Sequence, residues 1–220
     1  MNKEEVIKST IDFVQKTLEG AEGGHDWFHI ERVYKNAKLI AQGEEVDLFI
    51  VEIGSLLHDI ADAKFYKGDE SIGPKKAADF LRSMDVDETV ILHIENIIRY
   101  VSFKSSLDAD KNDTFNSNEL KVIQDADRLD AIGAIGIART FNYGGFKNRT
   151  LYDPEIAPLV GQDKETYKNS KAPTINHFYE KLLLLKDKMN TETARKIAEK
   201  RHLFMKQYLD QFYDEWNGKA

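Results

Sequence analysis

The pattern of apolar and polar positions predicts helices along nearly the whole chain. Ile7, Ile11, Val14 and Leu18 lie at helical spacing, and this first stripe stops near Gly20. No pair of strands and no internal repeat is evident, so the predicted fold class is all-α. Three further helices are predicted to begin after the capping residues Asp26, Asp47 and Asp87, and another carries Pro74 in its first turn. The last helices are predicted over about 120–138, 174–189 and 191–216.

Two features organise these helices into a bundle. The segment 48–57, LFIVEIGSLL, is apolar nearly all round, which indicates a central, buried helix. The polar residues 104–118 are predicted to form a loop, and the mixed segment 142–172 an irregular connection. Because no linker is evident, we expect one domain over residues 1–220, in which C-terminal helices at about 173–216 pack on a core at about 20–140.

Composition and charge narrow the function classes. A chain of 220 residues, 41% of them hydrophobic and 31% charged, can bury a core and is typical of a globular protein. The formal net charge of -7 argues against a nucleic-acid polymer as partner, because such binding needs clustered Lys and Arg. The absence of cysteine excludes disulfides, thiolate ligands and cysteine nucleophiles. No apolar leader or membrane-length run is evident, so we expect a cytoplasmic protein without a membrane partner.

The dipeptide His58-Asp59 is the strongest chemical signal in the chain. It closes the apolar run IVEIGSLL, where a carboxylate is costly unless a cation or several hydrogen bonds compensate it. His29 and Asp127, on two other predicted helices of the expected core, can complete a shell of two imidazoles and two carboxylates. Such a shell suits a divalent ion such as Mn, Fe, Co, Ni or Zn, and the two aspartates neutralise its charge.

These residues also carry a resemblance to a known family. His29, His58-Asp59 and Asp127 match in order the H…HD…D pattern of the HD-domain metal-dependent phosphohydrolases. The fragments HDWFHIERV, LLHDIADAKF, QDADRLDAIGAIGIAR and INHFYEKLLLLK are similar to the YedJ/YpgQ-like branch, and together they cover nearly the whole chain. The resemblance implies a single HD-domain helical bundle and one divalent metal ion, with Mn favoured and Mg, Fe, Co, Ni or Zn as alternatives.

The resemblance also selects among neighbouring residues. Its pattern assigns the ligand to His29, and the spacing to Val33 places His29 on an inward helix face. His25 precedes the Asp26 cap, so we expect it outside the helix, in the outer shell or facing the substrate. A His-x-x-x-His pair of ligands is the competing interpretation, but it lacks the Glu that follows the first His in zincins.

A similar choice arises among three aspartates. The family motif selects Asp127, which immediately precedes Arg128-Leu129, over Asp125 and Asp130. Asp125 is then expected to act as a cap or to support the ligands through hydrogen bonds.

A metal held by four side chains has about two positions left for water or substrate, and a bound water becomes acidic enough to attack a phosphoryl group. Asp62 is the candidate general acid or base because it follows Asp59 by three residues; the alternative is that it ends the helix in solvent. Lys64 is a candidate contact for an anionic substrate. Arg128 either contacts phosphate or pairs with Asp125.

The YpgQ-like branch implies a nucleotide substrate, and specifically hydrolysis of a nucleoside triphosphate to monophosphate and pyrophosphate. One rival function keeps the fold without turnover, as a metal-containing nucleotide sensor. A second is calcium binding by residues 108–119, DADKNDTFNSNE, where Asp108, Asp110, Asn112 and Glu119 match an EF-hand loop but Asp113 replaces its glycine. The C-terminal helices offer either a cover for the core or the surface of a homodimer.

Overall fold

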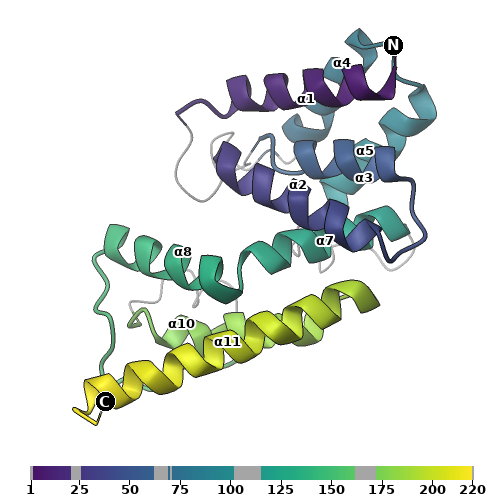
Figure 1. Cartoon of the computed structure of the whole chain (residues 1–220). Helices are drawn as coiled ribbons and strands as arrows, with labels where there is room; N and C mark the ends of the chain where they lie inside the picture. The colour runs from purple at the N-terminus through teal and green to yellow at the C-terminus, as the bar shows by residue number, and fades with distance from the viewer. Residues whose placement is uncertain are drawn as a thin grey trace. The chain divides into compact units, whose positions relative to one another are not determined.

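The computed structural model describes residues 2–20, 26–61, 69, 71–101, 115–161 and 172–219. Its helices are shown in Figure 1, and the described residues contain no strand, which confirms the predicted all-α class. The chain forms two compact units, residues 1–127 and 128–220, and each unit is described by itself. The single domain expected from the sequence stays a prediction.

The first unit is built from helices whose starts follow the predicted caps. Asp26 accepts a hydrogen bond from the backbone N–H of His29 at 2.9 Å, and Asp47 accepts one from Phe49 at 2.9 Å. Asp87 caps the fifth helix in the same way. The helices are α1 (Lys3–Thr17), α2 (Trp27–Ala41), α3 (Leu48–Leu57), α4 (Ile72–Ser83), α5 (Glu88–Tyr100) and the greater part of α7 (Asn118–Asp130).

Helix α3 is the centre of this unit, as its sequence predicted. Every residue from Phe49 to Leu57 is buried, and α3 packs against α1, α2 and α5. Gly54 permits a close approach of α7, because a Cβ atom at this position would lie 2.7 Å from Cδ1 of Ile123. Burial of α3 on all sides fixes its C-terminal end, where His58 and Asp59 follow.

The second unit consists of two longer helices and a series of short turns. An aromatic cluster joins its parts: the rings of Phe141 and Phe178 and those of Phe178 and Tyr208 lie about 6 Å apart. The elements are α8 (Gly133–Phe146), α10 (Asn176–Glu180), η2 (Leu182–Leu184), η3 (Lys186–Lys188) and α11 (Glu192–Trp216).

Three details of the predicted helices were wrong. The helix expected over about 120–138 is broken at residues 131–132, where Gly133 turns the chain with a φ of +79°. The segment 142–172 was predicted to be irregular, but α8 continues to Phe146. The helix expected over about 174–189 is instead α10 followed by two 3₁₀ turns, with Leu182 and Leu185 buried three residues apart as that geometry requires.

No helix in the described part of the chain is long and apolar enough to cross a membrane.

Candidate metal centre

Two buried histidines meet where α2 begins and α3 ends. His29 is the third residue of α2, and the cap provided by Asp26 fixes its backbone. His58 is the C-terminal cap of α3. The two side chains come from consecutive helices, and their ring centroids lie 5.5 Å apart at an angle of 63°. His29 is 4% exposed and His58 is 7% exposed, so both rings are largely removed from water.

The side chain of Asp59 completes a cluster with these histidines. Each of the three residues offers one ligand atom, and these atoms all lie within 4.8 Å of one another. Ligand bonds of a divalent transition metal are about 2.0–2.2 Å long, so two ligands of one ion lie at most about 4.4 Å apart. The spacing of His29, His58 and Asp59 is thus close to that of a mononuclear site, and the group can hold a metal ion.

A hydrogen bond determines which ring nitrogen of His58 can bind a metal ion. Its Nδ1 lies 2.8 Å from the carbonyl oxygen of Ser55, and a carbonyl only accepts, so Nδ1 carries the proton and donates it. Burial lowers the pKa of His58, an effect that the charges of Asp127 and Asp59 oppose without reversing. The ring is therefore neutral near pH 7, with the lone pair of Nε2 free of a proton. A neutral imidazole oriented by a carbonyl is the form in which histidine binds metals.

Asp127 approaches the cluster from α7. Its Oδ1 lies 3.5 Å from Nε2 of His29, and 46% of its side chain is exposed. It does not belong to the group of three whose ligand atoms are all mutually close. The assignment of Asp127 as a fourth ligand therefore stays a prediction, supported by its contact with His29.

The neighbouring aspartates have different environments. Asp125 is fully buried. Asp130 is also buried and forms an ion pair with Arg139. Asp127 differs from both neighbours in being half-exposed and beside His29, and its choice as the ligand stays a prediction.

The other predicted site residues are distributed as follows. Arg128 donates from Nη1 to the carbonyl oxygen of Lys188 at 2.9 Å, a contact that the sequence did not suggest. Its role toward a substrate stays a prediction. His25, Asp62 and Lys64 lie outside the described residues.

The loop considered as a rival calcium site, residues 108–119, is described only at its end. Residues 108–114 lie outside the described residues, whereas Glu119 belongs to the first turn of α7. Its Oε1 accepts the backbone N–H of Asp47 at 3.0 Å, and its Oε2 lies 3.5 Å from Nε2 of His93. This carboxylate therefore has a structural role that joins the start of α3 to α7.

A buried polar cluster in the first unit was not predicted from the sequence. Glu52 is 8% exposed and accepts a hydrogen bond from the hydroxyl of Tyr34 at 2.9 Å. The ammonium of Lys38 also lies 2.9 Å from its carboxylate. The signal available in the sequence was a glutamate within the otherwise apolar segment 48–57.

Comparisons with known proteins agree with this geometry. A model of the HD domain matches residues 27–132, the segment that contains the whole cluster. The chain is 40% identical over 206 residues to the uncharacterized protein YpgQ of Bacillus subtilis, covering 94% of this chain and 91% of that protein.

Two crystal structures extend the similarity to the fold. An HD-superfamily hydrolase from Bacillus thuringiensis has a TM-score of 0.78 and 45% identity, over 98% of this chain and 99% of that one. The structure of B. subtilis YpgQ in complex with ADP has a TM-score of 0.72 and 36% identity, over 98% and 97%. The buried histidines, the adjoining aspartate and similarity along nearly the whole length lead to one conclusion: this chain belongs to the HD-domain family of metal-dependent phosphohydrolases and is a homologue of YpgQ.

Proposed function

We propose that this protein is a divalent-metal-dependent phosphohydrolase that converts a nucleoside triphosphate to a nucleoside monophosphate and pyrophosphate. The observation that carries this proposal is the buried cluster of His29, His58 and Asp59. Two buried imidazoles and a partly buried carboxylate match the ligand preferences of divalent transition metals. These residues come from the start of α2 and the end of α3, so the cluster forms only in the folded chain.

The proposed ligands are His29, His58, Asp59 and Asp127. Mn²⁺ is the favoured ion, because mixed nitrogen and oxygen donors suit a cation of intermediate hardness. When bound, such an ion lowers the pKa of a coordinated water and polarises a phosphoryl oxygen. Asp127 contributes a second negative charge beside His29, so that the two carboxylates together balance the charge of the ion.

The remaining proposed roles belong to residues near the cluster in the sequence. Asp62 follows Asp59 by three residues and is proposed as the general acid or base that moves a proton during hydrolysis. His25, Lys64 and Arg128 are proposed to contact the substrate. Support for a nucleotide comes from B. subtilis YpgQ, whose structure in complex with ADP shows a nucleotide bound to a similar chain.

A nucleotide sensor without turnover would also bind ADP, so product analysis has to distinguish the two functions. Metal-stripped protein is incubated with Mn²⁺ and a panel of nucleoside mono-, di- and triphosphates, and phosphate and pyrophosphate are measured separately. We expect pyrophosphate from triphosphates, and loss of this product in His58→Ala and Asp59→Ala. The His93→Ala variant, altered outside the cluster, is the matched control and should retain activity.

The other outcomes of this experiment are equally informative. Release of phosphate alone would replace the proposed reaction with that of a phosphomonoesterase. Stoichiometric metal binding without any product would contradict the enzyme and favour the sensor. A separate calcium titration tests the loop at residues 108–119. Calcium binding that disappears in Glu119→Gln and persists in His58→Ala would favour this loop as the functional site.

A further inference from the structure

We propose that Arg139 and Arg201 are positioning residues that hold the last turn of α7, and with it the carboxylate of Asp127, beside His29. This inference rests on the proposed function and names two residues that set the position of its fourth proposed ligand. Helix α7 is continuous to Asp130, so an interaction that fixes its C-terminal end also fixes Asp127, one turn earlier. Neither arginine is proposed as a ligand, and both act through α7.

The last turns of α7 lie against α2. Oδ1 of Asp127 lies 3.5 Å from Nε2 of His29, and the side-chain amide of Asn36 donates to the carbonyl oxygen of Ala126 at 3.4 Å. Asn36 follows His29 by seven residues and therefore lies on the same face of α2. The side chain of Asp127 is half-exposed, so packing around it does not fix the carboxylate. Its distance from His29 therefore depends on where the backbone of α7 is held.

A buried charge ends this turn. Asp130 is 2% exposed and forms an ion pair with Arg139 of α8. A carboxylate removed from water is costly unless cations or hydrogen bonds compensate it, so the position of Asp130 follows that of its partner. The ion pair therefore ties the last residue of α7 to α8.

Arg201 reaches the same turn from α11. Its Nη1 donates to the carbonyl oxygen of Leu129, at the end of α7 where the helix dipole favours a positive charge. Burial lowers the pKa of the Arg201 guanidinium, and the negative charge of Asp130 opposes this effect. The guanidinium thus interacts with both the helix end and the buried carboxylate.

The turn between α7 and α8 is shaped to admit Arg201. Gly133 has a φ of +79°, and a Cβ atom at this position would lie only 3.0 to 3.2 Å from three carbons of the Arg201 side chain. The stem of Arg201 therefore passes closely over Gly133 before its guanidinium reaches Leu129. Helices α8 and α11 also pack against each other, so two arginines from one packed pair of helices hold the end of α7.

Metal affinity separates a positioning role from a purely structural one. A structural role would lower the stability of the fold and leave the affinity of folded variants for metal unchanged. If the arginines position Asp127, the affinity must fall in variants that are still folded. Mn²⁺ is therefore titrated calorimetrically into metal-stripped protein below the unfolding temperature, after circular dichroism has shown that each variant is folded.

Substitution of Arg139 provides the first comparison. Arg139→Leu keeps an apolar stem and removes the cation, and we expect Mn²⁺ to bind about tenfold more weakly, as on loss of groups that orient metal ligands. Arg139→Lys keeps a cation for Asp130 and should recover most of the affinity. Phe212→Leu alters an aromatic contact on α11 about 16 Å along the helix axis from Arg201. It is the matched control and should bind Mn²⁺ like the wild type.

A double substitution tests whether Arg139 acts through Asp127. Asp127→Asn alone should weaken Mn²⁺ binding, and adding Arg139→Leu should weaken it little further, because the side chain that Arg139 positions is already altered. Independent, additive losses would overturn the proposal. Arg201→Met keeps the stem over Gly133, removes the guanidinium, and should weaken binding about twofold or more. This variant provides the test if Arg139→Leu does not fold.

The outcomes distinguish this inference from the proposed function. Wild-type affinity in folded Arg139→Leu and Arg201→Met, with binding abolished in His58→Ala, would reject the positioning role and retain the metal centre. Absence of Mn²⁺ binding to the wild type would reject the metal centre, and the positioning role with it. An equal loss of affinity in Phe212→Leu would assign the effect to general destabilisation and also overturn the proposal.

Discussion

At the scale of single residues, the environment of His58 best explains how the chain prepares a metal ligand. The carbonyl of Ser55 fixes the proton on Nδ1, and burial lowers the pKa of the ring despite two neighbouring carboxylates. The carboxylate of Glu52, in the same unit, accepts a hydrogen bond from Tyr34 and is neutralised by Lys38. Buried polar groups therefore serve two purposes here: Glu52 is fully engaged within the fold, and the His58 cluster offers donors to an ion.

The hydrogen bond from Tyr34 should contribute measurably to stability. Tyr34→Phe removes a donor to a nearly buried carboxylate, which should lower the free energy of unfolding by about 1.5 kcal/mol. Urea denaturation at pH 7 measures the change. Tyr143→Phe is the matched control, because Tyr143 is 51% exposed and should change the free energy by less than about 0.5 kcal/mol. Equal effects of the two substitutions would show that the Tyr34 hydroxyl contributes nothing specific.

His177 should make stability depend on pH. Burial and the nearby charges of Lys181 and Arg149 lower its pKa from 6.5 to about 4 in the folded state. The unfolded chain then binds the proton more readily, so stability is complete above pH 6.5 and falls as the pH drops toward 4. The loss is at most about 3 kcal/mol, and solvent screening of the partly exposed ring reduces it.

Urea denaturation of wild type and His177→Gln at pH 7.5 and pH 4.5 isolates this effect. We expect the wild type to lose more stability than the variant between the two pH values. The same loss in both proteins would contradict the assignment of the pH dependence to His177.

At the scale of elements, the caps were predictable and the breaks were not. Asp26, Asp47 and Asp87 were each identified from the sequence because a short polar side chain ahead of an apolar stripe is a local signal. The break between α7 and α8 has only Gly133 as a local signal, and apolar residues continue at helical spacing through it. It depends on packing: a Cβ on Gly136 would lie 2.2 Å from the carbonyl oxygen of Ala131.

Two glycines of α8 allow this explanation to be tested. Gly136→Ala should destabilise the protein, because the backbone of Ala131 must shift to make room. Gly145→Ala should stabilise it by about 0.5 kcal/mol, because nothing lies within 4 Å of the added Cβ and alanine favours a helix. Thermal unfolding followed by circular dichroism compares the two variants. A stabilising Gly136→Ala would show that the close contact at Ala131 does not determine the break.

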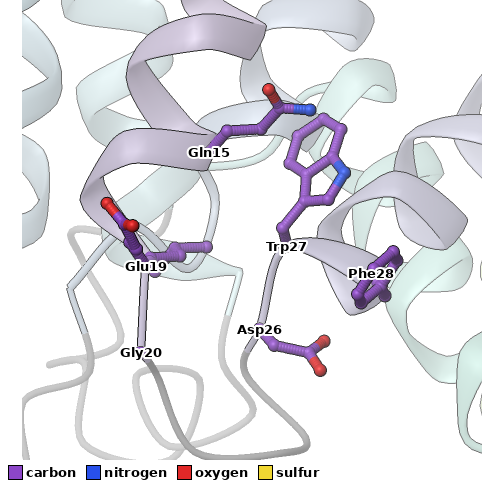
Figure 2. Close-up of a pocket in the computed structure, with 7 residues that line it drawn as sticks. Gln15, Glu19, Gly20, Asp26, Trp27 and Phe28 are labelled. Carbon is purple, nitrogen blue, oxygen red and sulfur yellow. The ribbon is translucent and has the colours of Figure 1, made fainter.

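At the scale of the whole molecule, the metal cluster joins the start of α2 to the end of α3, the next helix along the chain. His29, His58 and Asp59 lie in the first unit, and they were recognisable in the sequence because, with Asp127, they match in order the H…HD…D pattern of the HD-domain family. Their distances were not predictable, since they depend on how α3 is buried among α1, α2 and α5. The pocket between the end of α1 and the start of α2 (Figure 2) was likewise absent from the sequence prediction, because it requires these two segments to face each other.

A ligand that binds only the folded chain should stabilise it. Mn²⁺ at about 100 times its dissociation constant adds about 2.7 kcal/mol to the free energy of unfolding. The unfolding temperature should therefore rise, by on the order of 10 °C, when metal is added to stripped protein. Scanning calorimetry measures the shift, and His58→Ala should show little or none. An equal shift in this variant would indicate that the stabilising metal binds elsewhere.

The most direct test of the central claim is calorimetric titration of Mn²⁺ into metal-stripped protein. We predict one ion bound per chain, abolished or strongly weakened in His58→Ala and Asp59→Ala and retained in the control His202→Ala. Absence of binding to the wild-type chain, or unchanged binding to both cluster variants, would contradict the assignment of His29, His58 and Asp59 as the metal centre.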